Sequence, residues 1–382
     1  MSAIDTGARR AVRELRDWLG VVTSPPPGAF TGAFKGSSSD SATASSDDGR
    51  RPTWLESLRI PLGDRPRDRQ PARDEAPVPD WVAASPARIL RAWEAASRKP
   101  CGGWFAVEGS RRIGKHPKTF TISGRDVVLW RDEQGLHAAP EACPHMGASL
   151  AGAAVRDGCL VCPWHGLSLG PAGHGAWHHL PAFDDGTLVW IQLPGEAPLA
   201  RPVLPVRPRS AVDAVVRLEG QCEPEHIIRN RLDPWHGAHF HPYAFCDLEV
   251  IHADDERLRM NVAYRAFGPL VVDVVAEFTT PSARCIAMHI VDGEGRGSLV
   301  ETHATPLGHG RSAVVEATFA TSERDGFGLA RRLGAVIRPF MERSARRLWD
   351  DDVAYAERLA SIADGSPGPS TLRATRTAKR AR

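Results

Sequence analysis

The chain has 382 residues, of which 42% are hydrophobic and 25% charged, and 48 Lys and Arg against 46 Asp and Glu leave a formal net charge of +2. This composition is ordinary for a globular protein and disfavours nucleic acid as a partner, because nucleic-acid-binding domains are usually strongly basic. No stretch approaches the roughly 20 apolar residues of a membrane span, and the charged N-terminus lacks the apolar core of a secretory signal, so we expect a cytoplasmic chain of about two domains.

The two ends of the chain have the composition of disordered segments. Residues 1–84 are rich in Ser, Pro and charge, and only one short amphipathic helix is predicted there, over Ala11–Leu19. Residues 366–382 carry five basic residues and no acid, which favours a solvated basic tail over contact with a membrane surface or a partner. Such segments bury too little apolar surface to offset the entropy lost on folding.

A small all-β domain is predicted within residues 85–202. It is preceded by a helix over Pro86–Arg98, for which Ser85 is the expected N-cap. Short apolar segments that end at Gly, Asp or Pro then follow one another, as is typical of strands.

The second domain is predicted over residues 203–365. Strands are expected over 247–320, with a hairpin at Asp292–Gly295. From Gly328 to Ala363 the apolar spacing becomes helical. This domain therefore combines a sheet with a C-terminal helix.

Cysteine and histidine alternate in two short segments of the first domain. Cys143 and His145 lie in one, and after sixteen residues Cys162 and His165 lie in the other, giving C-x-H-x16-C-x2-H. Zinc can take such a set tetrahedrally, and a [2Fe–2S] cluster can take it with the cysteines on one iron and the histidines on the other. The spacing favours the cluster, because a zinc finger would place its histidines together on a helix.

These two segments resemble the Rieske motif. The matching stretches are Cys143–Ala148, with the sequence CPHMGA, and Cys162–Gly166, with the sequence CPWHG. The resemblance covers about residues 101–200. It implies a Rieske [2Fe–2S] cluster, with the following ligands: Cys143, His145, Cys162 and His165.

A second group of polar residues lies within 230–241, where the sequence is NRLDPWHGAHFH. Asp233 is expected to cap a helix, with Pro234 in its first turn. His236 and a later histidine suggest a metal site, although two ligands alone hold iron poorly. A carboxylate would complete a 2-His-1-carboxylate triad, which leaves positions on the metal free for dioxygen.

The helix predicted near the C-terminus offers such a carboxylate. At about 100° per residue, Asp352 lies in the same apolar stripe as Leu348 and Tyr355. Asp350 points to the opposite side. A carboxylate on an apolar face is costly to bury unless it is paired or bound to a metal. Asp352 is therefore either a metal ligand or a salt-bridged core residue.

Together the two groups resemble the Rieske non-haem iron oxygenases over about residues 100–360. The iron motif of that family has the form N-x2-D-x2-H-x4-H, followed much later by an Asp on a C-terminal helix. The matching residues are Asn230, Asp233, His236, His241 and Asp352. The resemblance implies a mononuclear Fe(II) bound by His236, His241 and Asp352, with His239 as the rival to His241.

The resemblance also implies roles for two further residues. Asp233 would link an iron-bound histidine to a Rieske histidine of the neighbouring subunit, which gives a path for electrons in a homotrimer. Asn230 would support the iron ligands from behind. The implied fold is α+β, with an N-terminal all-β Rieske domain, then a helix-grip (START-like) catalytic domain with an antiparallel sheet and a long C-terminal helix.

The expected activity is that of a terminal oxygenase. The chain contains no G-x-G-x-x-G fingerprint and no second cysteine set of the plant-ferredoxin type, so electrons are expected from a separate reductase and a ferredoxin. The single-chain layout resembles the monooxygenase-like branch of the family more than the ring dioxygenases. That branch implies a bulky apolar substrate, of terpenoid, carotenoid-like or steroid-like type, which is hydroxylated, desaturated or demethylated.

Five aromatic residues are candidates either to line a substrate pocket or to fill the core: Phe240, Tyr243, Phe245, Phe267 and Phe278. Two other functions stay open. The chain can be an electron-transfer Rieske protein, which would hold two irons per chain against the three of an oxygenase. It can also be a START-like lipid-binding protein that retains a Rieske domain and consumes no oxygen.

Overall fold

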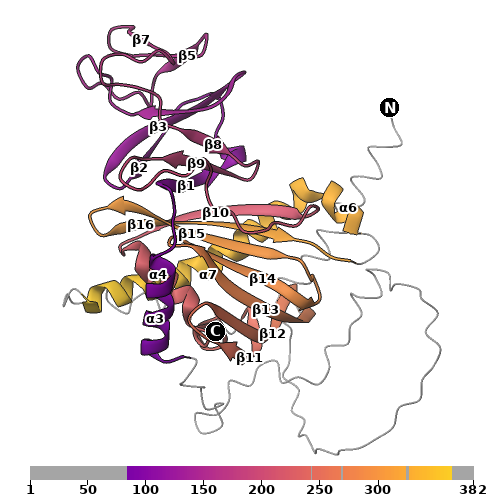
Figure 1. Ribbon diagram of the computed structural model, residues 1–382. Helices are drawn as coiled ribbons and strands as arrows, with labels where there is room; N and C mark the ends of the chain where they lie inside the picture. Colours follow the sequence, from indigo (N-terminus) through magenta and orange to yellow (C-terminus); the bar gives the residue numbers. More distant parts are fainter. Residues whose placement is uncertain (1–83, 242, 268–269, 324–326, 364–382) are drawn as a thin grey trace, which may run out of the picture.

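A computed structural model describes residues 84–241, 243–267, 270–323 and 327–363 (Figure 1). The predicted helix at Ala11–Leu19, the predicted disorder of residues 1–84 (apart from Ala84) and the predicted basic tail at 366–382 lie outside these residues. Within them, no helix is both long and apolar enough to cross a membrane.

The first helix, α3 (Pro86–Ser97), begins as its sequence predicts. The Ser85 hydroxyl accepts a hydrogen bond from the Arg88 N–H at 3.1 Å, and proline occupies the first turn. The buried Arg88 guanidinium donates to the carbonyls of Leu232, at 2.7 Å, and Asp254, at 3.0 Å. Both acceptors belong to the second domain. This helix therefore packs against the second domain, although the sequence places it beside the first.

The first domain is built from three antiparallel sheets of three strands each. Their orders are β1-β9-β8, β2-β3-β4 and β5-β6-β7. The strands are β1 (Trp104–Gly109), β2 (Lys118–Ile122), β3 (Arg125–Asp132), β4 (Gly135–Pro140), β5 (Ala154–Arg156), β6 (Cys159–Val161), β7 (Ser168–Leu169), β8 (Ala182–Asp184) and β9 (Leu188–Gln192), with a 3-10 turn at Ser110–Arg112. The predicted all-β domain is confirmed.

The second domain is a seven-stranded antiparallel sheet with the order β10-β16-β15-β14-β13-β12-β11. Its strands are β10 (Val212–Gly220), β11 (Phe245–Ala253), β12 (Arg257–Phe267), β13 (Leu270–Ser282), β14 (Cys285–Gly293), β15 (Leu299–Gly308) and β16 (Arg311–Ala320). The first strand pairs with the last, and two short helices, α4 (Pro224–Leu232) and α5 (His236–Phe240), lie between β10 and β11. The predicted hairpin at Asp292–Gly295 joins β14 to β15.

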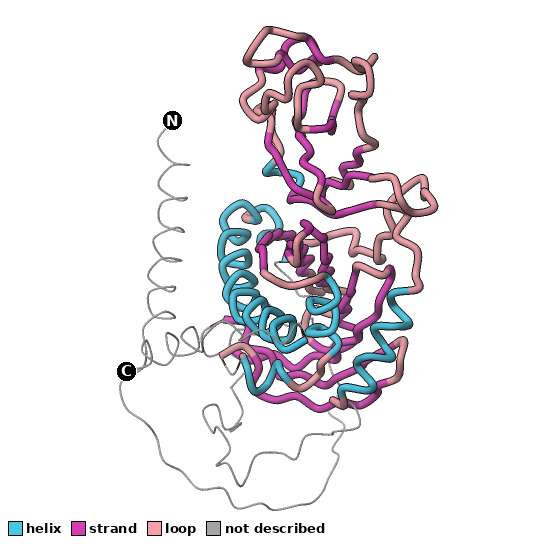
Figure 2. Tube along the Cα trace, turned by 90° about the vertical axis from the view of Figure 1, so that its left-hand side faces the viewer, coloured by secondary structure: helices cyan, strands magenta, loops and turns pink. Residues whose placement is uncertain are grey.

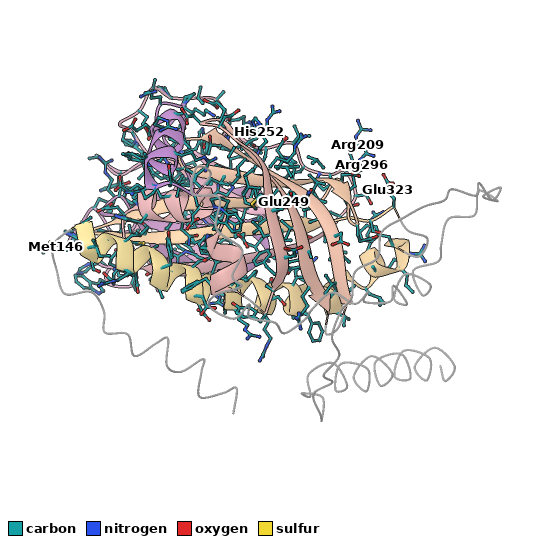
Figure 3. The ribbon with its side chains drawn as sticks, turned by 90° about the horizontal axis from the view of Figure 1, so that it is seen from below. Met146, Arg209, Glu249, His252, Arg296 and Glu323 are labelled. Atoms are coloured by element: carbon teal, nitrogen blue, oxygen red, sulfur yellow. The ribbon has the colours of Figure 1, made fainter. Side chains whose placement is uncertain are left out.

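Two helices follow the sheet, α6 (Phe327–Arg332) and α7 (Gly334–Ala363). Helix α7 crosses the strands on one side of the sheet, as Figure 3 shows from below. In the view of Figure 2 the helices lie within the curve of the strands. An antiparallel sheet wrapped on a long C-terminal helix is the α+β catalytic fold that the family resemblance implies.

The two faces of this sheet have different partners, because successive side chains of a strand point to opposite sides. Val216 packs with Trp349 of α7 in one core cluster. Its neighbour Val215 packs with Trp190 of the first domain in another. The sheet therefore separates the first domain from α7, as Figure 1 shows.

Arg207 joins the two domains through a buried ion-pair network. Its guanidinium lies 2.9 Å from a carboxylate oxygen of Asp185, which precedes β9, and its Nε–H donates to Glu301 of β15 at 3.0 Å. The side chain of Glu301 is fully buried. Because buried charges are stable only when they are paired, this network ties the first domain to one face of the sheet.

Candidate metal centres

The two predicted cluster loops have the same backbone conformation. The Gly147 N–H donates to the Cys143 carbonyl at 2.8 Å, and the Gly166 N–H donates to the Cys162 carbonyl at 3.0 Å. Both glycines have a positive φ, of 74° and 71°, which disfavours any residue with a Cβ. Each loop therefore folds back just after its histidine and brings its two candidate ligands to one end.

The four candidate cluster ligands lie together at the tip of the first domain. Cys143 and Cys162 are buried, at 3% and 2% exposure, and their thiols are in contact. The His145 and His165 rings are exposed and lie 4.8 Å apart, centroid to centroid. Buried cysteines with exposed histidines fit a cluster whose two irons differ in ligands.

The loop backbone also favours a thiolate at one position. Burial raises the pKa of the Cys162 thiol, but the backbone N–H groups of Trp164 and His165 outweigh burial and lower that pKa. Since a thiolate is the form of cysteine that binds metals, the loop favours the metal-binding form of Cys162. The nearby Cys159 lies in strand β6, as expected, and not among these loops.

The segment between α4 and α5 differs from its prediction. The Asp233 carboxylate accepts the Trp235 N–H at 3.0 Å, which is the bond expected of an N-cap. However, the short helix α5 begins only at His236, and Asp233 is the residue that follows the end of α4. The prediction that Asp233 caps a helix with Pro234 in its first turn is therefore wrong. The carboxylate closes a tight turn between two helices instead.

The second candidate centre brings together side chains from α5, the residue after it and α7. His236 Nε2 lies 3.3 Å from Asp352 Oδ1, and His241 Nε2 lies 2.8 Å from the same oxygen. The candidate ligand atoms of the three residues all lie within 4.8 Å of one another. In the described part of the chain, this is the one group of three such side chains close enough to share a metal ion.

The burial of the acidic residues on α7 follows the predicted stripe. Asp352 is 2% exposed, whereas Asp350 is exposed and Asp351 is half-buried. Asp352 therefore faces inward with the apolar residues of α7. The sequence alone left it as a ligand or a salt-bridged residue, and its neighbours in the structure are two imidazoles.

The electrostatics of this centre fit a cation. Burial raises the pKa of Asp352, but His236 and His241 outweigh burial and hold that pKa well below its usual range. Burial lowers the pKa of His241, but Asp351 and Asp352 outweigh it and raise that pKa to about 9. A buried carboxylate that gathers positive partners, in a set of two imidazoles and one carboxylate, has the donor chemistry that suits non-haem Fe(II).

Two polar residues support the ligands from behind. The fully buried Asn230 amide donates to Asp352 Oδ1 at 3.3 Å. His236 Nδ1 hydrogen-bonds to the Asp233 carbonyl at 2.9 Å. That bond makes Nδ1 the protonated nitrogen and leaves the lone pair on Nε2, which faces Asp352.

Sequence reasoning named two tyrosines of this centre but missed their hydrogen bonds. The Tyr355 hydroxyl donates to the Asp233 carboxylate at 3.2 Å, and its ring lies 5.6 Å from that of His236. The Tyr243 hydroxyl donates to Asp351 at 2.7 Å. A signal existed for Tyr355, since it lies three residues after Asp352 and therefore on the same face of the helix.

A cavity of about 470 Å³ lies between the sheet and α7, and His236, His241 and Asp352 are part of its wall. Most of the remaining wall is apolar, and strands β11 to β14 contribute its largest apolar share. The main apolar lining residues are Phe245, Leu248, Met260, Val262, Val274 and Phe278.

Of the five aromatic candidates, Phe245 and Phe278 line this cavity. Phe240 and Tyr243 do not, because Phe240 is 43% exposed and Tyr243 lies behind His241. The side chain of Phe267 lies outside the described ones. The same is true of the side chain of His239, so His241 is the residue that the geometry places beside Asp352.

Two protein families match the chain. Residues 103–194 match the family described as the Rieske [2Fe-2S] domain, and residues 193–366 match a domain of unknown function (DUF5914). The chloroacetanilide N-alkylformylase oxygenase component of Rhizorhabdus wittichii is 29% identical over 67% of this chain and 79% of its own length. Aminopyrrolnitrin oxygenase PrnD of Pseudomonas fluorescens is 33% identical, but over only 18% of this chain and 20% of its own length.

The fold is also similar to solved structures. The crystal structure of dicamba monooxygenase bound to dicamba aligns with a TM-score of 0.53 and 19% identity, over 73% of this chain and 96% of that one. The terminal oxygenase of carbazole 1,9a-dioxygenase from Novosphingobium sp. KA1 aligns with a TM-score of 0.50 and 15% identity, over 74% and 91%. These likenesses confirm a Rieske domain followed by a sheet-and-helix catalytic domain.

Proposed function

Because this chain belongs to the Rieske non-haem iron oxygenases, we propose that it is the terminal oxygenase of a multi-component system that oxidises a bulky apolar molecule. The observation that carries the proposal is the position of the three predicted iron ligands in the wall of a cavity of about 470 Å³. A cavity of that volume is in the range of small-molecule sites. Its apolar lining favours an apolar ligand.

The proposed division of labour follows the two centres. Cys143, His145, Cys162 and His165 would hold the [2Fe–2S] cluster, and His236, His241 and Asp352 would hold the iron. When bound, the cluster supplies single electrons and the mononuclear iron activates dioxygen. The residues of the chain would hold these groups. The Asp233 carbonyl orients the His236 imidazole, and the Asn230 amide orients the Asp352 carboxylate.

We also propose that electrons reach the iron from the cluster of a neighbouring subunit in a homotrimer. The loop with Cys162 and His165 lies between β6 and β7, at the end of the molecule farthest from the catalytic sheet (Figure 1). The Asp233 carboxylate lies 3.9 Å from His236 Nδ1 and is partly exposed, so it can also reach a residue of another subunit. Both observations support a path between subunits through Asp233.

The electron donor is proposed to be a separate reductase and ferredoxin that dock at the cluster end. Met146 and Trp164 flank the two histidines and are 67% and 62% exposed. Met146 lies at the edge of the molecule in Figure 3. Exposed apolar side chains beside a redox centre favour contact with a protein partner.

The reaction is proposed to be a hydroxylation, desaturation or demethylation. The relatives include an N-alkylformylase and a cholesterol 7-desaturase from Bombyx mori, which is 40% identical over 19% of this chain. A terpenoid, carotenoid-like or steroid-like molecule fits the apolar lining. The relatives therefore span more than one reaction type on apolar molecules.

The test is oxygen uptake by the reduced protein against a panel of apolar compounds, with products identified by mass. Cys143→Ala is expected to lose the cluster spectrum, whereas His236→Ala and Asp352→Ala lose only the mononuclear iron, and all three lose turnover. Retained turnover in His236→Ala would contradict the assignment. Two irons per chain would favour the electron-transfer protein, and ligand binding without oxygen uptake would favour the lipid carrier.

A further inference from the structure

The wall of the cavity holds charged residues besides the candidate iron ligands, namely Arg231, Asp233, Glu294 and Glu316. Arg231, at the end of α4, and Glu316, in the middle of β16, both line it. Glu316 is 6% exposed, and its charge interacts with that of Arg231. Ionisable side chains in a largely apolar wall are costly to bury unless they have partners, so the partners of these two residues matter.

The carboxyl of Glu316 is satisfied by groups of the fold. The Thr302 hydroxyl, directly across on β15, donates to Glu316 Oε2 at 2.9 Å, and the Trp349 indole also donates to this carboxyl. Burial raises the pKa of Glu316 above its usual value, although these two donors and the charge of Arg231 oppose that shift. Both partners are donors, as a carboxylate requires.

Arg231 is different, because one buried donor of its guanidinium has no partner. In the described part of the chain, its buried Nε–H has no hydrogen-bond partner and no ion pair joins it to a carboxylate within 4.0 Å. Its guanidinium carbon lies 5.6 Å from the Phe278 ring centroid and 5.7 Å from that of Trp349. These rings come from opposite walls of the cavity and hold the guanidinium between them.

We propose that Arg231, with Glu316 as its counter-charge, binds an uncharged hydroxyl or carbonyl oxygen of an otherwise apolar substrate. Resting on the proposed function, this inference narrows the substrate to a mono-oxygenated apolar molecule. The unpartnered N–H requires an acceptor, which excludes a plain hydrocarbon as the preferred ligand. Asp233, Glu294 and Glu316 already place three carboxyl groups in the same wall, which disfavours a carboxylate as the ligand group.

The pair also places the substrate relative to the iron ligands. Trp349, which contacts both charged residues, precedes Asp352 by three residues on α7. At 1.5 Å per residue this is about 4.5 Å along the helix. The substrate oxygen is therefore held near the part of α7 that also carries Asp352.

The test uses four tricyclic probes of one shape: fluorene, 2-hydroxyfluorene, 9-fluorenone and fluorene-2-carboxylate. Binding to the iron-loaded full chain is measured without dioxygen, by quenching of tryptophan fluorescence. The two oxygenated neutral probes are expected to bind about tenfold more tightly than fluorene or the carboxylate, since a hydrogen bond to a charged donor is worth about that factor.

Two variants and one control test whether Arg231 and Glu316 cause the preference for the neutral oxygenated probes. Arg231→Met is expected to bind the two neutral oxygenated probes no better than fluorene. Glu316→Gln removes the counter-charge and is expected to bind fluorene-2-carboxylate about tenfold more tightly than the wild type does. Arg229→Met, on the same helix but outside the cavity, is expected to keep the wild-type preference.

Equal affinities of the wild type for fluorene and its oxygenated forms, absence of binding by every probe, or a preference that survives Arg231→Met would each overturn the inference. Because binding is measured without turnover, this result is independent of the oxygenase test. If the protein consumes oxygen and Arg231→Met still prefers the neutral oxygenated probes, the role of Arg231 is refuted and the proposed function stands. If Arg231→Met loses this preference but the wild type consumes no oxygen, the role of Arg231 stands and the proposed function is refuted.

Discussion

At the scale of single residues, the mononuclear centre depends on one oxygen atom. Asp352 Oδ1 is contacted by His236, at 3.3 Å, by His241, at 2.8 Å, and by the Asn230 amide, at 3.3 Å. The two histidines are candidate metal ligands, so their contacts with Asp352 change when a metal binds between them. The Asn230 amide is not a candidate ligand and does not titrate, so its hydrogen bond remains. Asn230 therefore keeps the carboxylate oriented whichever cation faces it.

Replacing Asn230 by Ala should weaken the binding of mononuclear iron about tenfold, because supporting hydrogen bonds of this kind are worth roughly 10–100-fold in metal affinity. Iron affinity is measured by titration of the metal-free protein, with the cluster absorption as a check that the first domain is intact. Asn261→Ala is the control, since Asn261 is bonded to Glu249 on the surface. Unchanged iron affinity in Asn230→Ala would rule out this supporting role.

At the scale of elements, helix α3 shows how a local signal and a distant contact combine. Ser85 and a proline in the first turn begin the helix from within the segment itself. Its amphipathic face then buries Ile89 and Ala92 in the core shared by α7 and the sheet. The local signals explain why the helix forms, and the core explains where it lies.

Ser85→Ala should lower the free energy of unfolding by about 1 kcal/mol, because it removes the side-chain oxygen that accepts the Arg88 N–H. The measurement is urea unfolding followed by circular dichroism. Ser97→Ala, at the exposed other end of the same helix, is expected to change stability by much less. Equal losses in the two variants would contradict a capping role for Ser85.

At the scale of the whole molecule, the sheet of the second domain is shared between two partners. One face packs on α7 and encloses the cavity, and the other carries the first domain through Arg207 and its buried carboxylates. This arrangement fixes the cluster end on one side of the sheet and the iron ligands on the other. Because the candidate cluster and the candidate iron site of one chain lie on opposite sides of this sheet, we expect electrons to reach the iron from the cluster of a second chain.

Asp185→Asn should destabilise the protein by about 3 kcal/mol at pH 7, because it leaves part of a buried ion pair unbalanced. Burial raises the pKa of Asp185, but Arg207 outweighs it and lowers that pKa. The contribution of Asp185 is therefore present above its unfolded pKa of about 4 and is lost as pH falls through the lower folded value.

Urea midpoints of the wild type and Asp185→Asn, measured from pH 7 down to about pH 3, check this prediction. The difference between them should shrink as the pH falls. Asp255→Asn is the matched control, since Asp255 pairs with Arg91 on the surface, where ion pairs contribute little. A difference that stays constant with pH would show that the charge of Asp185 does not matter.

Mixing two inactive variants tests the path between subunits. Cys143→Ala subunits lack a cluster and His236→Ala subunits lack the iron, so neither homo-oligomer should turn over. Co-assembled from a mixture, the two should recover turnover, because the cluster of one subunit then faces the iron of another. No recovery in co-assembled oligomers, confirmed by mass, would place the electron path within one chain.

Much of this protein could be predicted from its sequence, because the signals are local or periodic. The cluster loops carry their ligands and their turn glycines within a few residues, and the alternation of apolar residues gives the strands. The inward orientation of Asp352 follows from the helical period alone. The pairing of Cys143 with Cys162 in one site was inferred from the spacing of the cysteines and histidines, and the resemblance to the Rieske motif supported it.

Only the tertiary structure decided the rest, because it depends on contacts between residues far apart in the chain. It ended α4 at Leu232 and began α5 at His236, where Asp233 closes a turn that the sequence had assigned to a helix cap. It also showed that α3, which precedes the first domain in the sequence, packs against the second. It also brought Arg231 and Glu316 into one apolar cavity, although 85 residues separate them, and no local period or spacing can carry that information.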